Sequence, residues 1–150
     1  MDTDTIVKLA ELKNITALKD STGSVDDLSQ LLLKLPKDFA VYSGDDYMTF
    51  AAVAMGAVGV VSVASHVVGK EIKEMVQCVK NDNLDRAREL HLQLYPMFKG
   101  MFVTANPIPV KTACNMLGWN VGKTRMPLCE MEPAHADLLR KAMKEYGLNV

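Results

Sequence analysis

Short continuous apolar runs alternate with amphipathic stretches in the first half of the chain. The runs predict strands at residues 15–18, 39–42 and 58–63. The stretches around them have apolar residues at helical spacing and predict helices at 5–12, 24–35 and 47–55. Strands that are apolar throughout are usually buried on both faces of a parallel sheet. We therefore expect an α/β fold in which parallel strands alternate with helices.

In the second half of the chain, apolar residues recur at helical spacing only. It predicts helices at residues 67–80, 84–102, 106–117 and 133–146, and no further strand. Prolines open the third of these helices, and glycines close the third and fourth. We therefore divide the chain into an α/β part over residues 1–80 and a helical region over residues 81–150.

The predicted sheet is narrow, and both of its edges are apolar. The outer strands, 15–18 and 58–63, carry no charge within the strand, although soluble proteins normally protect exposed edges in this way. Other strands should therefore flank them. We interpret the chain as part of a larger barrel rather than as a complete sheet.

Composition narrows the class of protein. The 150 residues are 49% hydrophobic and 23% charged, with a net charge of −1, so no basic excess indicates nucleic-acid or membrane-surface binding. The longest apolar stretch, residues 50–63, is broken by glycines and is too short to cross a bilayer. Three cysteines without paired spacing are typical of reduced thiols. We expect a cytoplasmic protein.

Lys19 is the first candidate for chemistry, because it ends an apolar run and polar residues follow at once. It is either an ordinary strand-end lysine that reaches solvent or an amine that attacks a carbonyl. The second role requires apolar surroundings that favour the free amine. Gly44 would lie beside it, because the turns after successive parallel strands meet at one edge of the sheet, and glycine lets backbone approach a ligand closely.

Other polar residues give weaker indications. The backbone near Val61 could line the same pocket mouth, although its strand is mainly core. His66 follows that strand, whereas His91 and His135 fall on predicted helices and are expected at the surface or an interface. The histidines are scattered, so no metal site is predicted.

Three stretches together resemble one enzyme family. Residues 15–23 (ITALKDSTG) resemble the Schiff-base strand of the dihydrodipicolinate synthase and N-acetylneuraminate lyase family. Residues 42–46 (YSGDD) and 56–63 (GAVGVVSV) resemble the next two strand segments. Residues 106–111 (NPIPVK) resemble the helical-tail motif of the dihydrodipicolinate synthase branch more than that of the sialic-acid lyases.

The resemblance implies a TIM barrel with a C-terminal helical extension, of which this chain is the last three β/α units and the extension. It implies that Lys19 forms an imine with pyruvate, that the backbone of Gly44 and Val61 lines the pyruvate pocket, and that no cofactor or metal takes part. The enzyme would condense pyruvate with aspartate-semialdehyde in lysine and diaminopimelate biosynthesis. The family is usually tetrameric.

The same resemblance implies that the chain is incomplete as a catalyst. The family's threonine pair, proton-relay tyrosine and substrate-binding arginine come from earlier strands, which have no counterpart here. We expect the chain alone to be inactive, with either copies of itself or a complementary N-terminal fragment as its partner. Two alternatives are a related pyruvate-dependent sugar-acid aldolase and a non-catalytic half-barrel that self-associates.

Overall fold

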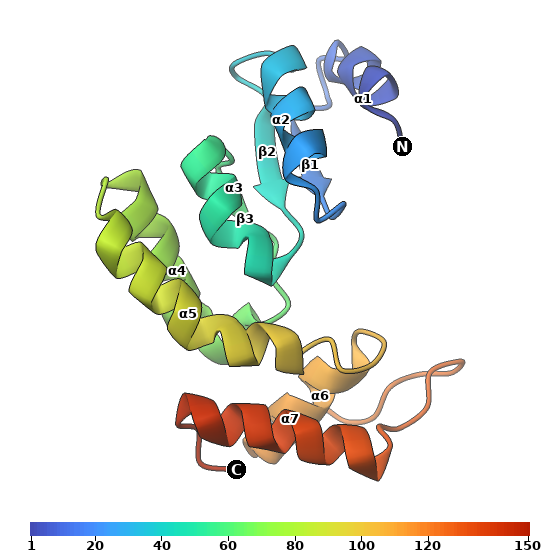
Figure 1. Ribbon diagram of the computed structural model, residues 1–150. Coiled ribbons are helices and arrows are strands. Elements are labelled where there is room, and N and C mark those ends of the chain that lie inside the picture. The colour runs from blue at the N-terminus through green and yellow to red at the C-terminus, as the bar shows by residue number, and fades with distance from the viewer.

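The computed structural model describes all 150 residues (Figure 1). Three strands are present: β1 (Ala17–Asp20), β2 (Ala40–Ser43) and β3 (Gly59–Val60). The helices around them are α1 (Thr3–Ala10), α2 (Val25–Lys34), the short 3-10 helix η1 (Asp46–Met48) and α3 (Thr49–Met55). The remaining elements are four helices joined by irregular segments: α4 (Ser65–Lys80), α5 (Leu84–Gly100), α6 (Ile108–Met116) and α7 (Pro133–Tyr146). In Figure 1 the strands lie at one end of a crescent, α4 and α5 lie in the middle, and α6 and α7 lie at the other end.

The three strands form one parallel sheet in the order β1-β2-β3, as the alternating pattern predicts. Lys19 pairs with Tyr42 in the register of β1 and β2. β1 starts two residues later than predicted, because the N–H of Ile15 donates to the carbonyl of Leu12 and closes a turn after α1. Lys19 is therefore inside the strand rather than beyond its end.

β3 is only two residues long, although its apolar run is longer. The run leaves the sheet because the N–H groups of Val63 and Ala64 donate to the side chain of Asp46. The chain then turns into α4.

Helix ends follow local signals closely. Ser24 accepts a hydrogen bond from the N–H of Asp27 and so caps α2, as its position before an acidic first turn predicts. Gly56 closes α3 with a φ of 118°, a left-handed conformation that glycine adopts without strain.

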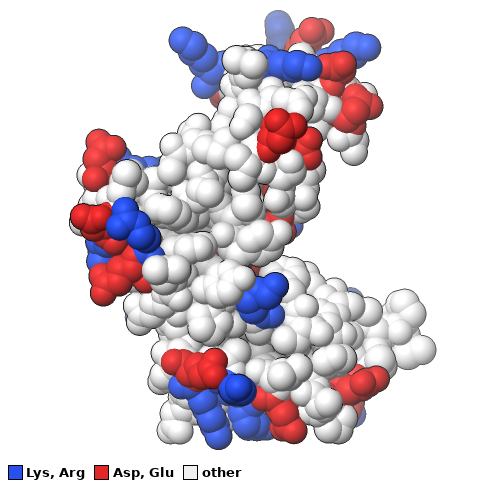
Figure 2. All heavy atoms as spheres, in the orientation of Figure 1, with Lys and Arg blue, Asp and Glu red and all other residues white.

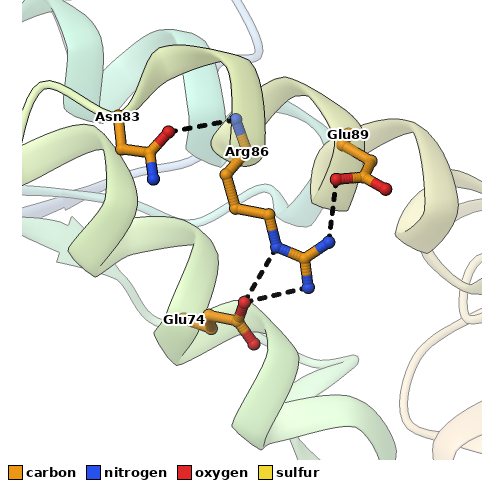
Figure 3. A network of polar contacts seen from close by, with 4 residues as sticks. All are labelled: Glu74, Asn83, Arg86 and Glu89. Carbon is orange, nitrogen blue, oxygen red and sulfur yellow. Dashed lines mark hydrogen bonds and ion pairs between the residues drawn. The ribbon is translucent and has the colours of Figure 1, made fainter.

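α4 and α5 form an antiparallel pair whose turn is held by polar contacts (Figure 3). Asn83 caps α5 by accepting from the N–H of Arg86. The guanidinium of Arg86 then bridges the two helices, with contacts of 2.9 Å to Glu74 on α4 and 2.8 Å to Glu89 on α5. α5 continues through Pro96 to Gly100.

The core has two parts of unequal size. The larger is a cluster of 17 buried residues that runs from Val53 to Met143 and unites α3 to α7. The smaller has six buried residues, drawn from α2, β2 and α3 and the segments beside them. The larger cluster contains residues from both sides of residue 80, because α4 packs against α5. The division of the chain into an α/β part and a helical region at residue 80 stays a prediction.

Charged side chains of both signs gather at the α1 end, around the α4–α5 turn and along α7, and the surface between these groups is largely uncharged (Figure 2). No helix combines the length and apolar character needed to cross a membrane.

Candidate active site

Lys19 and Gly44 lie side by side at the carboxyl ends of β1 and β2. A Cβ atom added to Gly44 would stand 1.8 Å from Oγ of Ser21 and 2.7 Å from Cε of Lys19. Both distances are far inside van der Waals contact, so a larger residue at this position would force the side chains of Ser21 and Lys19 to move. The predicted proximity of this turn to Lys19 is confirmed.

Val61 follows β3 at the same edge of the sheet. Its N–H donates to the carbonyl of Ser43 at 2.8 Å, and its side chain is 48% exposed. The N–H of Gly44 is also used inside the sheet, because it donates to the carbonyl of Asp20. The structure thus brings Lys19, Gly44 and Val61 to the ends of three successive parallel strands, the edge at which α/β barrels carry their active sites.

The side chain of Lys19 is exposed. The residues of this chain therefore do not supply the apolar surroundings that a carbonyl-attacking amine requires, and the role of Lys19 stays a prediction. Lys19 is exposed because β1 has a neighbouring strand on one side only.

Carboxylates border the lysine. Burial, followed by the charges of Asp20 and Asp46, raises the pKa of Asp45 above its usual range, and the charge of Lys19 opposes this shift. Asp20 accepts hydrogen bonds from the N–H and hydroxyl of Thr22. A recess bounded by Asp20, Ser43 and Asp45 has a volume of about 10 Å³, which is too small for an organic substrate.

Comparison with known proteins decides the family. The model of the "Dihydrodipicolinate synthetase family" matches residues 1–146. The chain belongs to this family.

Relatives within the dihydrodipicolinate synthase family are close over the whole chain. The 4-hydroxy-tetrahydrodipicolinate synthase of Nostoc punctiforme is 49% identical over 145 residues, which are 97% of this chain and 49% of the relative. That of Microcystis aeruginosa is 45% identical and covers 99% of this chain and 50% of its own length. The chain thus spans about half the length of the curated relatives it matches.

Solved structures of the family agree with this alignment. The dihydrodipicolinate synthase of Aquifex aeolicus superposes with a TM-score of 0.93 at 44% identity, over 98% of this chain and 50% of that one. The enzyme of Cyanidioschyzon merolae, solved with lysine bound, gives a TM-score of 0.94 at 42% identity, over 99% of this chain and 51% of that one. The chain is therefore a partial barrel of three β/α units with a helical extension, as the sequence indicates.

Asp46 is buried, whereas the sequence indicated only that it belongs to the turn after the second strand. Its side chain is fully buried, and Oδ2 accepts from the N–H groups of Val63 (3.2 Å) and Ala64 (2.9 Å) at the start of α4. Oδ1 has no hydrogen-bond partner. Asp46 therefore fixes the path from β3 to α4, and no local signal could have found it, because its partners lie 17 and 18 residues away.

His91 is partly buried in an aromatic cluster between two helices, and its expected place at the surface or an interface stays a prediction. Its ring centroid is 5.7 Å from that of Phe50, 6.3 Å from Tyr95 and 6.1 Å from Phe98, and Nδ1 is buried without a partner. Burial lowers the pKa of His91 below its usual value. His91 thus helps to pack α3 against α5.

His66 stands closer to the candidate site. Its Nδ1 lies 3.0 Å from the carbonyl of Val63, just beyond β3. Together with Asn106 and Lys111 it lines a cavity of about 310 Å³. The NPIPVK stretch at residues 106–111 therefore adjoins the segment that follows the third strand.

Proposed function

We propose that this chain supplies the imine-forming lysine of a 4-hydroxy-tetrahydrodipicolinate synthase, which joins pyruvate to aspartate-semialdehyde in lysine and diaminopimelate biosynthesis. The observation that carries the proposal is the close approach of Lys19 Cε to Gly44 at the carboxyl ends of β1 and β2. Membership of the dihydrodipicolinate synthase family supports the same reaction class.

The free amine of Lys19 would attack the keto carbon of pyruvate, and water would leave as the imine forms. The protonated imine withdraws electrons from the pyruvate methyl carbon. Loss of a proton from that carbon gives an enamine, whose carbon attacks the aldehyde of the second substrate. The pyruvate is thus held covalently, and the proposed reaction uses no metal or cofactor.

The surrounding residues have complementary roles in this scheme. Gly44 leaves room at the point where the lysine side chain passes the turn after β2. Val61 stands at the end of the third strand, where its backbone can line the pyruvate pocket. The nearby carboxylate of Asp45 would attract the positive charge of the protonated imine, because opposite charges attract.

The proton transfers need groups that this chain does not carry. Positioned acids and bases typically contribute about 10²–10⁴-fold each, so we expect the chain alone to be inactive. A complementary N-terminal half would restore them, and the complete barrel would act as a homo-oligomer in the cytoplasm.

A covalent chimera tests the proposed function directly. The upstream half of the Nostoc punctiforme synthase, which this chain does not match, is joined in frame before residue 1 and incubated with pyruvate and borohydride. We expect a reduced pyruvyl adduct on Lys19, found by peptide mass mapping. Lys19→Arg should abolish the adduct, and Lys13→Ala, an exposed lysine outside the strands, should leave it unchanged. A folded chimera without an adduct on Lys19 would refute the proposal.

A further inference from the structure

Two short segments at the carboxyl edge of the sheet are tied to each other at both ends. One is the turn after β2, and the other is the segment that follows β3. At one end the N–H of Val61 donates to the carbonyl of Ser43 at 2.8 Å. At the other end the N–H of Val63 donates to Oδ2 of Asp46 at 3.2 Å. The segments between these two hydrogen bonds form a site frame, residues 43–46 and 61–63.

Short-range hydrogen bonds stiffen each half of the site frame. After β2, Oγ of Ser43 accepts from the N–H of Asp45 at 3.1 Å and donates to the carbonyl of Asp45 at 3.0 Å. After β3, Oγ of Ser62 accepts from the N–H of Ser65 at 2.8 Å, and Oγ of Ser65 donates to the carbonyl of Ser62 at 3.1 Å. Because each half is braced locally, the position of one half relative to the other depends on the bonds that join them.

Asp46 is the side chain that joins the two halves. It is fully buried, and Oδ2 also accepts from the N–H of Ala64 at 2.9 Å. Ala64 is the N-cap of α4 and makes no side-chain capping bond of its own, so the carboxylate supplies the acceptor at this helix end. β3 has only two residues and gives the segment little further support. Without the carboxylate, the bond from Val61 to β2 would hold the exit of β3 alone.

The site frame contains two of the three positions assigned to the pyruvate site. The N–H of Gly44 donates to the carbonyl of Asp20 and so ties the frame to β1, and a Cβ added to Gly44 would stand 2.7 Å from Cε of Lys19. β2 lies between β1 and β3, and neighbouring strands are about 4.8 Å apart, so Lys19 and Val61 start from strands separated by about 10 Å. A keto acid joined to Nζ of Lys19 would then pass over Gly44, and Val61 would limit the space beyond it.

We propose that Asp46 is a positioning residue of the pyruvate site, which holds Val61 against the turn after β2 and so limits the size of the 2-keto acid that Lys19 accepts. Asp46 is buried away from the substrate and acts through the backbone of Val61. When the site frame loosens, Val61 moves away from Gly44, contacts to pyruvate weaken, and a longer keto acid gains room. The inference rests on the proposed function, since it concerns the keto-acid selectivity of the same lysine.

Keto-acid selectivity in the covalent chimera is the first test. The borohydride-trapped adduct on Lys19 is measured against the concentration of pyruvate and, separately, of 2-oxobutyrate, which is longer by one methylene. A fitted pocket distinguishes one methylene by about 10–200-fold, so the parent should need at least about tenfold more 2-oxobutyrate than pyruvate for half-saturation. Asp46→Asn, which keeps one oxygen and loses the charge, should reduce this ratio at least about fivefold. The adduct rate at saturating pyruvate should change less than the ratio.

Ser24→Ala is the matched control. It removes the hydrogen bond that caps α2 and so costs the chain a comparable amount of stability, at a place outside the site frame. A general loss of stability would affect both variants alike, so only Asp46→Asn should shift the ratio of the two keto acids. If Asp46→Asn does not fold in the chimera, Asp46→Glu, which keeps the charge and displaces the carboxylate by one methylene, should lower the ratio in the same direction.

Amide hydrogen exchange of the 150-residue chain tests the site frame without a substrate. In Asp46→Asn the N–H of Val61 should exchange at least about tenfold faster than in the parent, because the frame opens locally when its second tie is weakened. The N–H of Met97, in the fully buried part of α5, should rise by a smaller factor. In Ser24→Ala the two amides should change by the same factor.

The outcomes separate this inference from the proposed function. If the parent chimera forms the Lys19 adduct, the proposed function stands. The positioning role of Asp46 is then overturned by a parent ratio below about tenfold, by an equal ratio in the parent and the Asp46 variant, or by a rise in exchange at Val61 no larger than that at Met97. A folded parent chimera without the adduct refutes the proposed function, and the selectivity inference fails with it.

Discussion

Replacement of Asp46 by alanine tests the contact that links the candidate site to the helical part of the chain. The side chain is fully buried and joins the turn after β2 to the N-terminus of α4. Asp46→Ala would leave the N–H groups of Val63 and Ala64 without their acceptor, and Ala64 is itself fully buried.

The expected loss of stability is about 3 kcal/mol. Hydrogen bonds to a charged acceptor contribute about 1.5–3 kcal/mol each, and a carboxylate near a helix N-terminus adds about 0.3–1 kcal/mol. Part of this loss of stability is offset. Oδ1 of Asp46 is buried without a hydrogen-bond partner, so removing it also removes a desolvation cost of about 1–3 kcal/mol. Asp46→Asn keeps one acceptor oxygen and removes the buried charge, so we expect it to cost about 1 kcal/mol.

Urea unfolding followed by circular dichroism measures both variants, with the free energy of unfolding taken from linear extrapolation. Asp45→Ala is the matched control, since this neighbouring carboxylate is less buried and should change stability by no more than about 0.5 kcal/mol. A loss below about 1 kcal/mol for Asp46→Ala, or an equal loss for Asp45→Ala, would contradict the assignment of Asp46 as the anchor of α4.

Three further substitutions have defined outcomes. Burial lowers the pKa of His91, so on acidification the unfolded chain binds a proton before the folded chain does. The stability that His91 contributes is therefore complete above about pH 6.5 and is lost as the pH falls toward and through the folded pKa. Thermal melts from about pH 7.5 to about pH 5.5 should show a larger loss for the parent than for His91→Leu, and parallel losses would contradict this. Gly44→Ala should lower the free energy of unfolding by about 1–3 kcal/mol and abolish the Lys19 adduct in the chimera, because the new Cβ overlaps Ser21 and Lys19. Gly69→Ala, whose new Cβ meets nothing nearer than 3.6 Å, should instead raise the urea midpoint by an amount equivalent to about 1 kcal/mol.

Elements with local signals could be predicted from the sequence. The cap at Ser24 and the stop at Gly56 depend on residues within one turn of the helix end, and both are confirmed. The parallel sheet follows from continuous apolar runs between helices, and it is confirmed too. The start of β1 could not be placed, because Ile15 is apolar yet uses its N–H to close a turn.

Contacts between distant segments could not be predicted. Asp46 looks like one of several turn residues until α4 is placed above it. His91 follows buried Leu90 on α5, and its partner Phe50 comes from α3, so spacing along one helix could not show that these two rings pack together. The exposure of Lys19 was one of two readings that the sequence left open, because an apolar run reads as buried whether or not a neighbouring strand is present.

The two observations on Lys19 have a joint consequence for reactivity. Gly44 lies beside Cε of Lys19, yet β1 has no fully buried side chain and a strand on one side only. The side chain of Lys19 therefore lies at the ends of the strands but is left in contact with water by the residues of this chain. In the chimera that joins the upstream half of the Nostoc punctiforme synthase before residue 1, the added residues would cover this side chain. The pyruvate–borohydride reaction should therefore form the Lys19 adduct at least about tenfold faster in the chimera than in the chain alone, because a covered site excludes water and holds the reactants together, and equal rates would contradict this reasoning.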